Sequence, residues 1–155
     1  MQTIEVIPLE YCDLKIRIKN FLSKCWQRHW DRTNEPPNET KLYPIKPVLQ
    51  DWKSSDRRNR SEEITLARLR FGTCLLNKKY LLTGEPFPFC TPCQTDLTIA
   101  HLLIDCPEHC QKRKPMVDHL NRERLHLSLE NILNDNFPHD LLIKFLDQTG
   151  YLKKI

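Results

Sequence analysis

The chain has 155 residues and a net charge of +4, and 39% of its residues are hydrophobic and 28% charged. These values are typical of a soluble globular protein of one domain, or of one domain with an appendage, that can build its own core. No apolar run approaches the roughly 20 residues of a membrane-spanning helix, and the N-terminus lacks the basic and apolar segments of a secretory signal. We therefore expect an intracellular protein without a membrane partner, in the nucleus or the cytoplasm, which the sequence does not distinguish.

Composition also indicates the fold class. Three glycines and eleven prolines accompany many Leu, Lys, Arg and Glu residues. Few glycines disfavour tight hairpins, whereas unbranched side chains favour helices, with prolines where the helices end. We expect a mainly α protein that forms one compact unit from three segments, residues 1–52, 53–115 and 116–155.

In the N-terminal segment, residues 3–7 predict a short strand and residues 11–30 predict a helix. The apolar residues of this helix recur at steps of three and four, which predicts a stripe that packs in the core. Four prolines between residues 31 and 47 predict an extended connector, because proline interrupts helices. The stripe consists of Leu14, Ile18, Phe21, Leu22, Cys25, Trp26 and Trp30.

The middle segment is basic: between Lys53 and Lys79, eight basic and three acidic residues give a net charge of +5. A helix is predicted to begin near Ser61, whose hydroxyl can cap the amide of Ile64, and Gly72 should break or kink it. Gly84 should stop the helical turns that follow. The basic residues form either a solvated helix face or a phosphate-binding surface. The candidates for nucleic-acid contact are Arg57, Arg58, Arg60, Arg68 and Arg70.

The C-terminal part is helical and acidic. Helices are predicted at residues 107–124, 128–134 and 138–148. Residues 125–150 carry four acidic residues and one lysine. A basic middle and an acidic end predict a polarised molecule.

A cluster of cysteines carries the strongest chemical signal. The spacing is Cys90-x2-Cys93-x7-His101-x4-Cys106. Two residues between the first cysteines let one tight turn present both thiolates to a tetrahedral ion. Mixed thiolate and imidazole donors suit zinc better than Mg²⁺ or Ca²⁺, and four protein ligands leave no open coordination position. The cluster therefore predicts a structural Zn²⁺ in a zinc knuckle embedded in the helical domain.

Two alternatives stay open around this cluster. His109 and Cys110 follow closely, so Cys110 can replace Cys106 as the fourth ligand, although the shorter spacing from His101 favours Cys106. Phe87 and Phe89 flank the first ligand and are candidates for stacking on nucleic-acid bases, together with Tyr80. Alternatively, both phenylalanines pack beneath the metal site.

These residues carry a resemblance to a known family. The segments LARLRFG and KYLLTGEPFPFCTPCQTDLTIAHLLIDCP, with a Trp-x3-Trp helix and a Trp-Lys-Ser-Ser segment upstream, resemble the region downstream of the ribonuclease H domain in reverse transcriptases of jockey-type non-LTR retrotransposons. The resemblance covers about residues 8–115. The family tends to carry Gly-His-Thr after its Arg-Leu-Arg segment, where this chain has Gly72-Thr73-Cys74. The departure indicates a diverged or inactive copy.

The sequence shows no catalytic constellation. It lacks the paired aspartates of a polymerase palm, the spaced acidic set of a ribonuclease H, a G-x-S-x-G nucleophile motif and a glycine-rich phosphate loop. We expect a chain that is not an enzyme by itself. The resemblance implies a zinc-knuckle tail of a reverse transcriptase polyprotein. We expect this tail to bind single-stranded RNA or DNA and to contact other domains of that polyprotein. The alternative is a zinc-stapled helical module for protein interaction or structural support.

Overall fold

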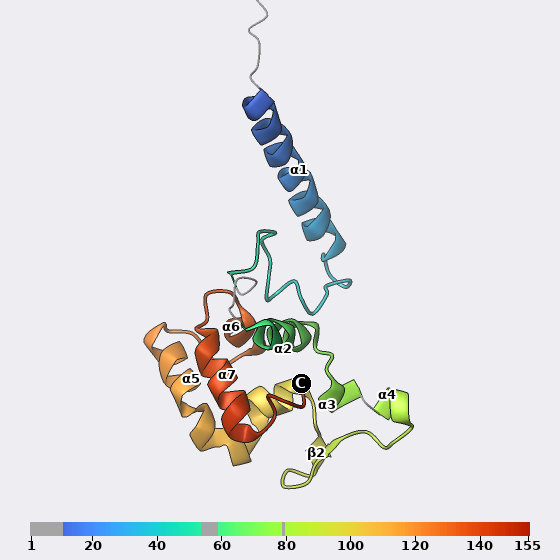
Figure 1. The fold of residues 1–155 in the computed structure, drawn as a ribbon, viewed down its shortest axis with the longest axis vertical. Helices are drawn as coiled ribbons and strands as arrows, with labels where there is room; N and C mark the ends of the chain where they lie inside the picture. The colour runs from blue at the N-terminus through green and yellow to red at the C-terminus, as the bar shows by residue number, and fades with distance from the viewer. Residues whose placement is uncertain (1–10, 54–58, 79) are drawn as a thin grey trace, which may run out of the picture. The chain divides into compact units, whose positions relative to one another are not determined.

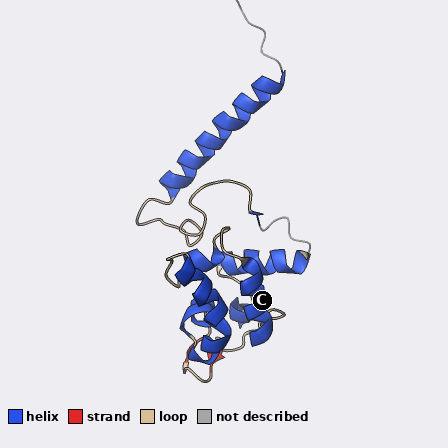
Figure 2. Ribbon diagram, turned by 90° about the vertical axis from the view of Figure 1, so that its left-hand side faces the viewer, coloured by secondary structure: helices blue, strands red, loops and turns tan. Residues whose placement is uncertain are grey.

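The computed structural model describes residues 11–53, 59–78 and 80–155, and within these residues the protein is mainly helical, as predicted (Figure 1). Figure 2 shows the strands of this described part confined to one short hairpin. The strand predicted at residues 3–7 lies outside the described residues. The described chain divides into two compact units, residues 11–40 with 47–50 and residues 41–46 with 51–155, where the sequence led us to expect one.

The first unit contains α1 (Tyr11–Thr33), a single helix that extends three residues beyond the predicted end. The connector is attached to its polar side: the Gln27 amide donates to the carbonyl of Pro47 at 2.8 Å and accepts from the amide of Leu49 at 2.7 Å. No residue of α1 is buried, and the stripe residues from Leu14 to Trp26 include side chains that are 46% to 70% exposed. The prediction that this stripe packs in the core is therefore wrong, because its side chains are exposed.

The second unit contains the hydrophobic core. It is built from α2 (Arg60–Phe71), α5 (Cys110–Arg122), α6 (Leu129–Leu133) and α7 (His139–Thr149), with α5 alongside α7 (Figure 1). Two short helices, α3 (Leu75–Lys78) and α4 (Tyr80–Thr83), follow α2. The fully buried side chains come from these four helices and from the segment that follows the cysteine pair. They include Leu66, Leu69, Leu102, Leu103, Met116, Leu120, Ile132, Leu133, Leu142, Phe145 and Leu146.

Helix ends follow local chemistry. The Asn59 side chain, rather than Ser61, caps α2, because it accepts from the amide of Ser61 at 3.0 Å and the helix begins one residue early. Gly72 ends α2 with φ +67°, as predicted, and its amide donates to carbonyls of the last turn. The Ser128 hydroxyl caps α6, also within the predicted helix. The helix predicted at 107–124 is a 3-10 turn, Pro107–His109, followed by α5.

Candidate metal centre

The structure brings Cys90, Cys93, His101 and Cys106 into one group. One potential ligand atom from each side chain lies within 4.8 Å of the other three. The Sγ atom of Cys106 lies 4.0 Å from that of Cys90 and 3.7 Å from that of Cys93. Three of the four residues are buried and Cys93 is half-buried. The group can therefore hold a metal ion, at the positions that the spacing predicted.

A hairpin positions the first two cysteines. Strand β1 (Phe89–Cys90) pairs antiparallel with β2 (Thr95–Asp96), so that Cys90 faces Thr95. Between the strands, Gln94 adopts a left-handed conformation with φ +54°, and its amide donates to the carbonyl of Cys90 at 2.9 Å. This reversal returns the chain within five residues and places both thiols on the inner side of the turn. The sequence predicted the turn but not that Gln94 makes it.

A π-helical turn, His101–Asp105, positions the other two donors. The amide of Cys106 donates to the carbonyl of His101 at 2.8 Å, across five residues instead of four. In a regular α-helix, residues five apart point about 140° away from each other, whereas the wider π turn stacks them on one side. The turn therefore converts the His-x4-Cys spacing into a convergent pair. The hydroxyl of Thr98 supports its start by accepting from the amide of His101 at 3.0 Å.

The residues fit a metal ion by their chemistry. His101 Nε2 is buried and has no hydrogen-bond partner among the residues that the structure describes. A buried nitrogen without a partner is costly, and a metal ion bound to its lone pair removes that cost. Desolvation, followed by hydrogen bonds and repulsion from Cys90 and Cys106, raises the pKa of Cys93 to about 12. A bound cation reverses that tendency, because metal ligation holds cysteine as the thiolate. Four donors of this type form a closed tetrahedral set.

Neither alternative donor belongs to this group. Cys110 is exposed at the first position of α5. The ring of His109 packs edge-on against Phe145 and Tyr151, with centroid distances of 6.0 and 5.7 Å. Burial, followed by the charges of nearby Lys and Arg side chains, lowers the pKa of His109. The geometry thus favours Cys106 as the fourth ligand.

Sequence reasoning assigned no role to Arg113, which supports the cluster from beneath. Its guanidinium is buried and donates to the carbonyls of Leu102 at 3.3 Å and Cys106 at 3.0 Å, the end of the π turn. Burial lowers its pKa, opposed by the thiols of Cys106 and Cys110. The signal is hidden because Arg113 stands between two lysines and looks like part of a solvated run. The positive charge of Arg113 lies close to Cys106, where it can offset the negative charge of a thiolate.

The basic candidates do not form one free surface. Arg57 and Arg58 lie outside the described residues. Arg60 is exposed and pairs with Glu63 at 2.9 Å, an i,i+3 pair of small energetic value. Arg68 donates to the carbonyl of Ile155 at 2.6 Å, so its side chain holds the C-terminus against α2. Arg60 and Arg68 are therefore at the surface, and each already interacts with another residue of the chain.

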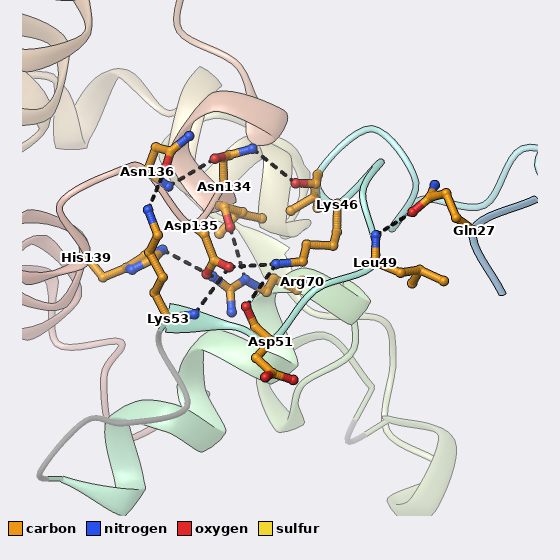
Figure 3. A network of polar contacts seen from close by, with 12 residues as sticks. Gln27, Lys46, Leu49, Asp51, Lys53, Arg70, Asn134, Asp135, Asn136 and His139 are labelled. Carbon is orange, nitrogen blue, oxygen red and sulfur yellow. Dashed lines mark hydrogen bonds and ion pairs between the residues drawn. The ribbon is translucent and has the colours of Figure 1, made fainter. Parts of the chain in front are cut away.

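The prediction that Arg70 contacts nucleic acid is wrong, because this residue is buried and takes part in a structural network (Figure 3). Its guanidinium donates to Leu133 O at 3.0 Å, pairs with Asp135 at 3.2 Å and stacks 3.8 Å from the ring centre of Trp52. It also lies 3.2 Å from Nε2 of His139. Lys46 reaches the same Asp135 at 2.8 Å. Arg70 therefore joins α2 to the α6–α7 region and cannot contact nucleic acid.

The aromatic candidates are at the surface rather than beneath the metal site. Phe87 is 37% exposed and Phe89 is 50% exposed. Tyr80 and Phe87 pack with ring centroids 4.9 Å apart at an angle of 60°. These three residues line a surface depression of about 680 Å³ immediately before the first ligand. Its other lining residues are Leu76, Glu85, Pro86, Pro88 and Lys154.

No family model, curated protein or solved structure matches this chain. Among the residues that the structure describes, no helix combines the length and apolar character needed to cross a membrane.

Proposed function

We propose that this chain is a zinc-stapled module that binds single-stranded RNA or DNA and has no polymerase or nuclease activity of its own. The sequence resemblance to the tail of jockey-type reverse transcriptases supports this proposal and implies a position after a ribonuclease H domain. The metal is Zn²⁺, since three cysteine thiolates and one imidazole form a soft, tetrahedral donor set. All four positions are protein ligands, so the ion has a structural role.

Zinc in this site stabilises the segment that carries the binding surface. The hairpin with Cys90 and Cys93 has only two residues in each strand, too short to be stable alone. The metal ties it to the π turn, whose Leu102 and Leu103 are fully buried in the core. The two-residue strand that begins with the exposed Phe89 thereby gains a fixed position in the second unit.

The exposed aromatic residues beside the first ligand carry the nucleic-acid proposal. An aromatic ring at the surface offers a stacking face to any base, whereas a buried ring does not. Phe87 and Phe89 supply such faces. Positive charge for phosphates comes from Lys154, which lines the same depression, and from the exposed Lys78. Compared with the expectation from sequence, the surface moves from the arginines of α2 toward the knuckle.

The test is fluorescence anisotropy of the zinc-loaded chain with a labelled oligouridylate of about 12 nucleotides, at several salt concentrations. Phe89→Ala should weaken binding by roughly 5- to 150-fold, because one stacked base contributes roughly 1–3 kcal/mol. Phe71→Ala is the matched control, since Phe71 is 62% exposed at the end of α2, away from the knuckle. Equal effects of the two substitutions, or the absence of salt-dependent binding, contradict the proposal.

A second arm tests the charge. Replacing Lys78 and Lys154 together by Gln should lower affinity and flatten the salt dependence, because fewer counterions are released. An unchanged slope shows that these two lysines do not contact phosphates. In that case the protein-interaction module becomes the better proposal, and the exposed apolar stripe of α1 is the observation that favours it.

A further inference from the structure

Helix α1 displays an apolar face that nothing in its own unit covers. At 100° per residue, five large side chains fall within an arc of about 140° along one side of the helix. Their exposed fractions range from 46% to 70%, so the face is open along its length. These side chains, which we call the α1 stripe, are Leu14, Ile18, Phe21, Leu22 and Trp26.

The connector is attached to the opposite side of α1. Gln27 lies about 180° from the centre of the stripe, and both of its amide atoms bind the connector at Pro47 and Leu49. The helix is therefore attached through its polar side and presents its apolar side. Helices in proteins gain most of their stability from packing of the apolar face. This 23-residue helix thus presents an apolar face that has no partner within its own unit.

The charges around the stripe define the chemistry of that groove. Helix α1 carries six basic and two acidic residues. Both acidic residues, Asp13 and Asp31, fall on the side away from the stripe. Lys15 and Arg32 fall within its arc, and the other charged residues at its edges are also basic. They are Arg17, Lys19 and Arg28.

We propose that the α1 stripe docks into an apolar groove of a partner protein whose walls and rim carry carboxylates. Large anchors at i, i+4, i+7, i+8 and i+12 are the pattern of helix-in-groove recognition. A carboxylate within the groove meets Lys15, which a lipid surface cannot do inside its apolar layer. A second copy of α1 is disfavoured, because two stripes face to face bring only cations together.

The probe is calcium-loaded calmodulin, a protein with acidic, Met-rich apolar grooves, titrated calorimetrically with the full 155-residue chain. We expect one-to-one binding. Phe21→Ala should weaken it at least about 10-fold, as for a central anchor. Lys19→Glu with Arg28→Glu should also weaken it and remove its salt dependence. Asn20→Ala, on the far side of the helix, is the matched control and should leave the affinity within about 2-fold.

Four outcomes overturn the proposal. The first is no binding to the groove, and the second is binding that Phe21→Ala and Asn20→Ala affect equally. The third is Trp26 fluorescence that acrylamide fails to quench in the free chain, which means that the stripe is covered already. The fourth is binding to phosphatidylserine vesicles, or self-association in sedimentation, that Phe21→Ala abolishes while the groove stays empty. Circular dichroism and metal content of each variant exclude misfolding as the cause.

Discussion

The metal cluster and the Arg70 network both place ionisable groups in the interior of the second unit, and they differ in range. The four cluster residues lie between Cys90 and Cys106, whereas Arg70 and Asp135 are 65 residues apart and Lys46 and Asp135 are 89 apart. Nearby donors converge through a hairpin and a π turn before the rest of the fold contributes. The distant pair meets only once α2 and α6 pack together. The cluster should therefore depend on metal, and the network on the global fold.

The largest effect is expected at the cluster. Cys106→Ser should reduce zinc from about one equivalent per chain to nearly none, and the loss of stability should exceed that of any other substitution here, because structural zinc binds small sites with about 10 kcal/mol or more. Elemental analysis and thermal unfolding measure both. Cys110→Ser, at an exposed thiol, should retain the metal. The reverse result would identify Cys110 as the fourth ligand.

The network should show the next largest effect without any change in metal content. Arg70→Met removes a buried cation and leaves the half-buried carboxylate of Asp135 and the carbonyl of Leu133 with one partner fewer each, so it should lower the free energy of unfolding by about 3 kcal/mol in chemical denaturation. Arg60→Met removes an exposed ion pair and should change it by less than about 0.5 kcal/mol. Similar losses for both variants, or zinc loss in Arg70→Met, contradict the separation of the two regions.

The pH dependence of stability should report the network through Asp135. Burial alone favours the neutral acid, but the hydrogen bond and charge of Lys46, the Lys53 amide and Arg70 outweigh it and lower the pKa of Asp135. A depressed folded pKa contributes stability that is present above the unfolded value and is lost as the pH falls through the folded pKa. Asp135→Asn should flatten this acid branch of the unfolding curve. An unchanged slope shows that Asp135 is not the group that titrates.

A smaller effect than that of Arg70→Met is expected at the start of the π turn. Thr98→Ala removes the acceptor of the His101 amide and should cost about 1 kcal/mol, the usual value of such a cap. It should also weaken zinc, because the turn orients two ligands, whereas Thr98→Ser keeps the oxygen and should preserve both properties. Competition with a chelating dye measures the zinc affinity. Identical affinities in the two variants assign the turn to core packing alone.

Prediction from sequence worked where few, nearby residues decide the structure. Gly72 ends α2 as expected, and α6 lies within the helix predicted at residues 128–134, because residues close in sequence decide where these helices begin and end. Prediction was wrong for the α1 stripe, whose spacing is the same for a core helix and for a docking helix. It was also wrong for Arg70, which follows Arg68 by two residues and resembles it in every local respect.

The sequence by itself determined the mainly helical class and the four residues of the candidate metal site, because periodicity, helix-end chemistry and ligand spacing act within a few turns of chain. Only the tertiary structure decided which basic residues are surface and which are interior. Arg70 is buried because Asp135, Leu133 O and the Trp52 ring converge on it from distant segments, whereas Arg60 meets only its own helix. Burial of a charge depends on partners gathered by packing, and no local pattern records them.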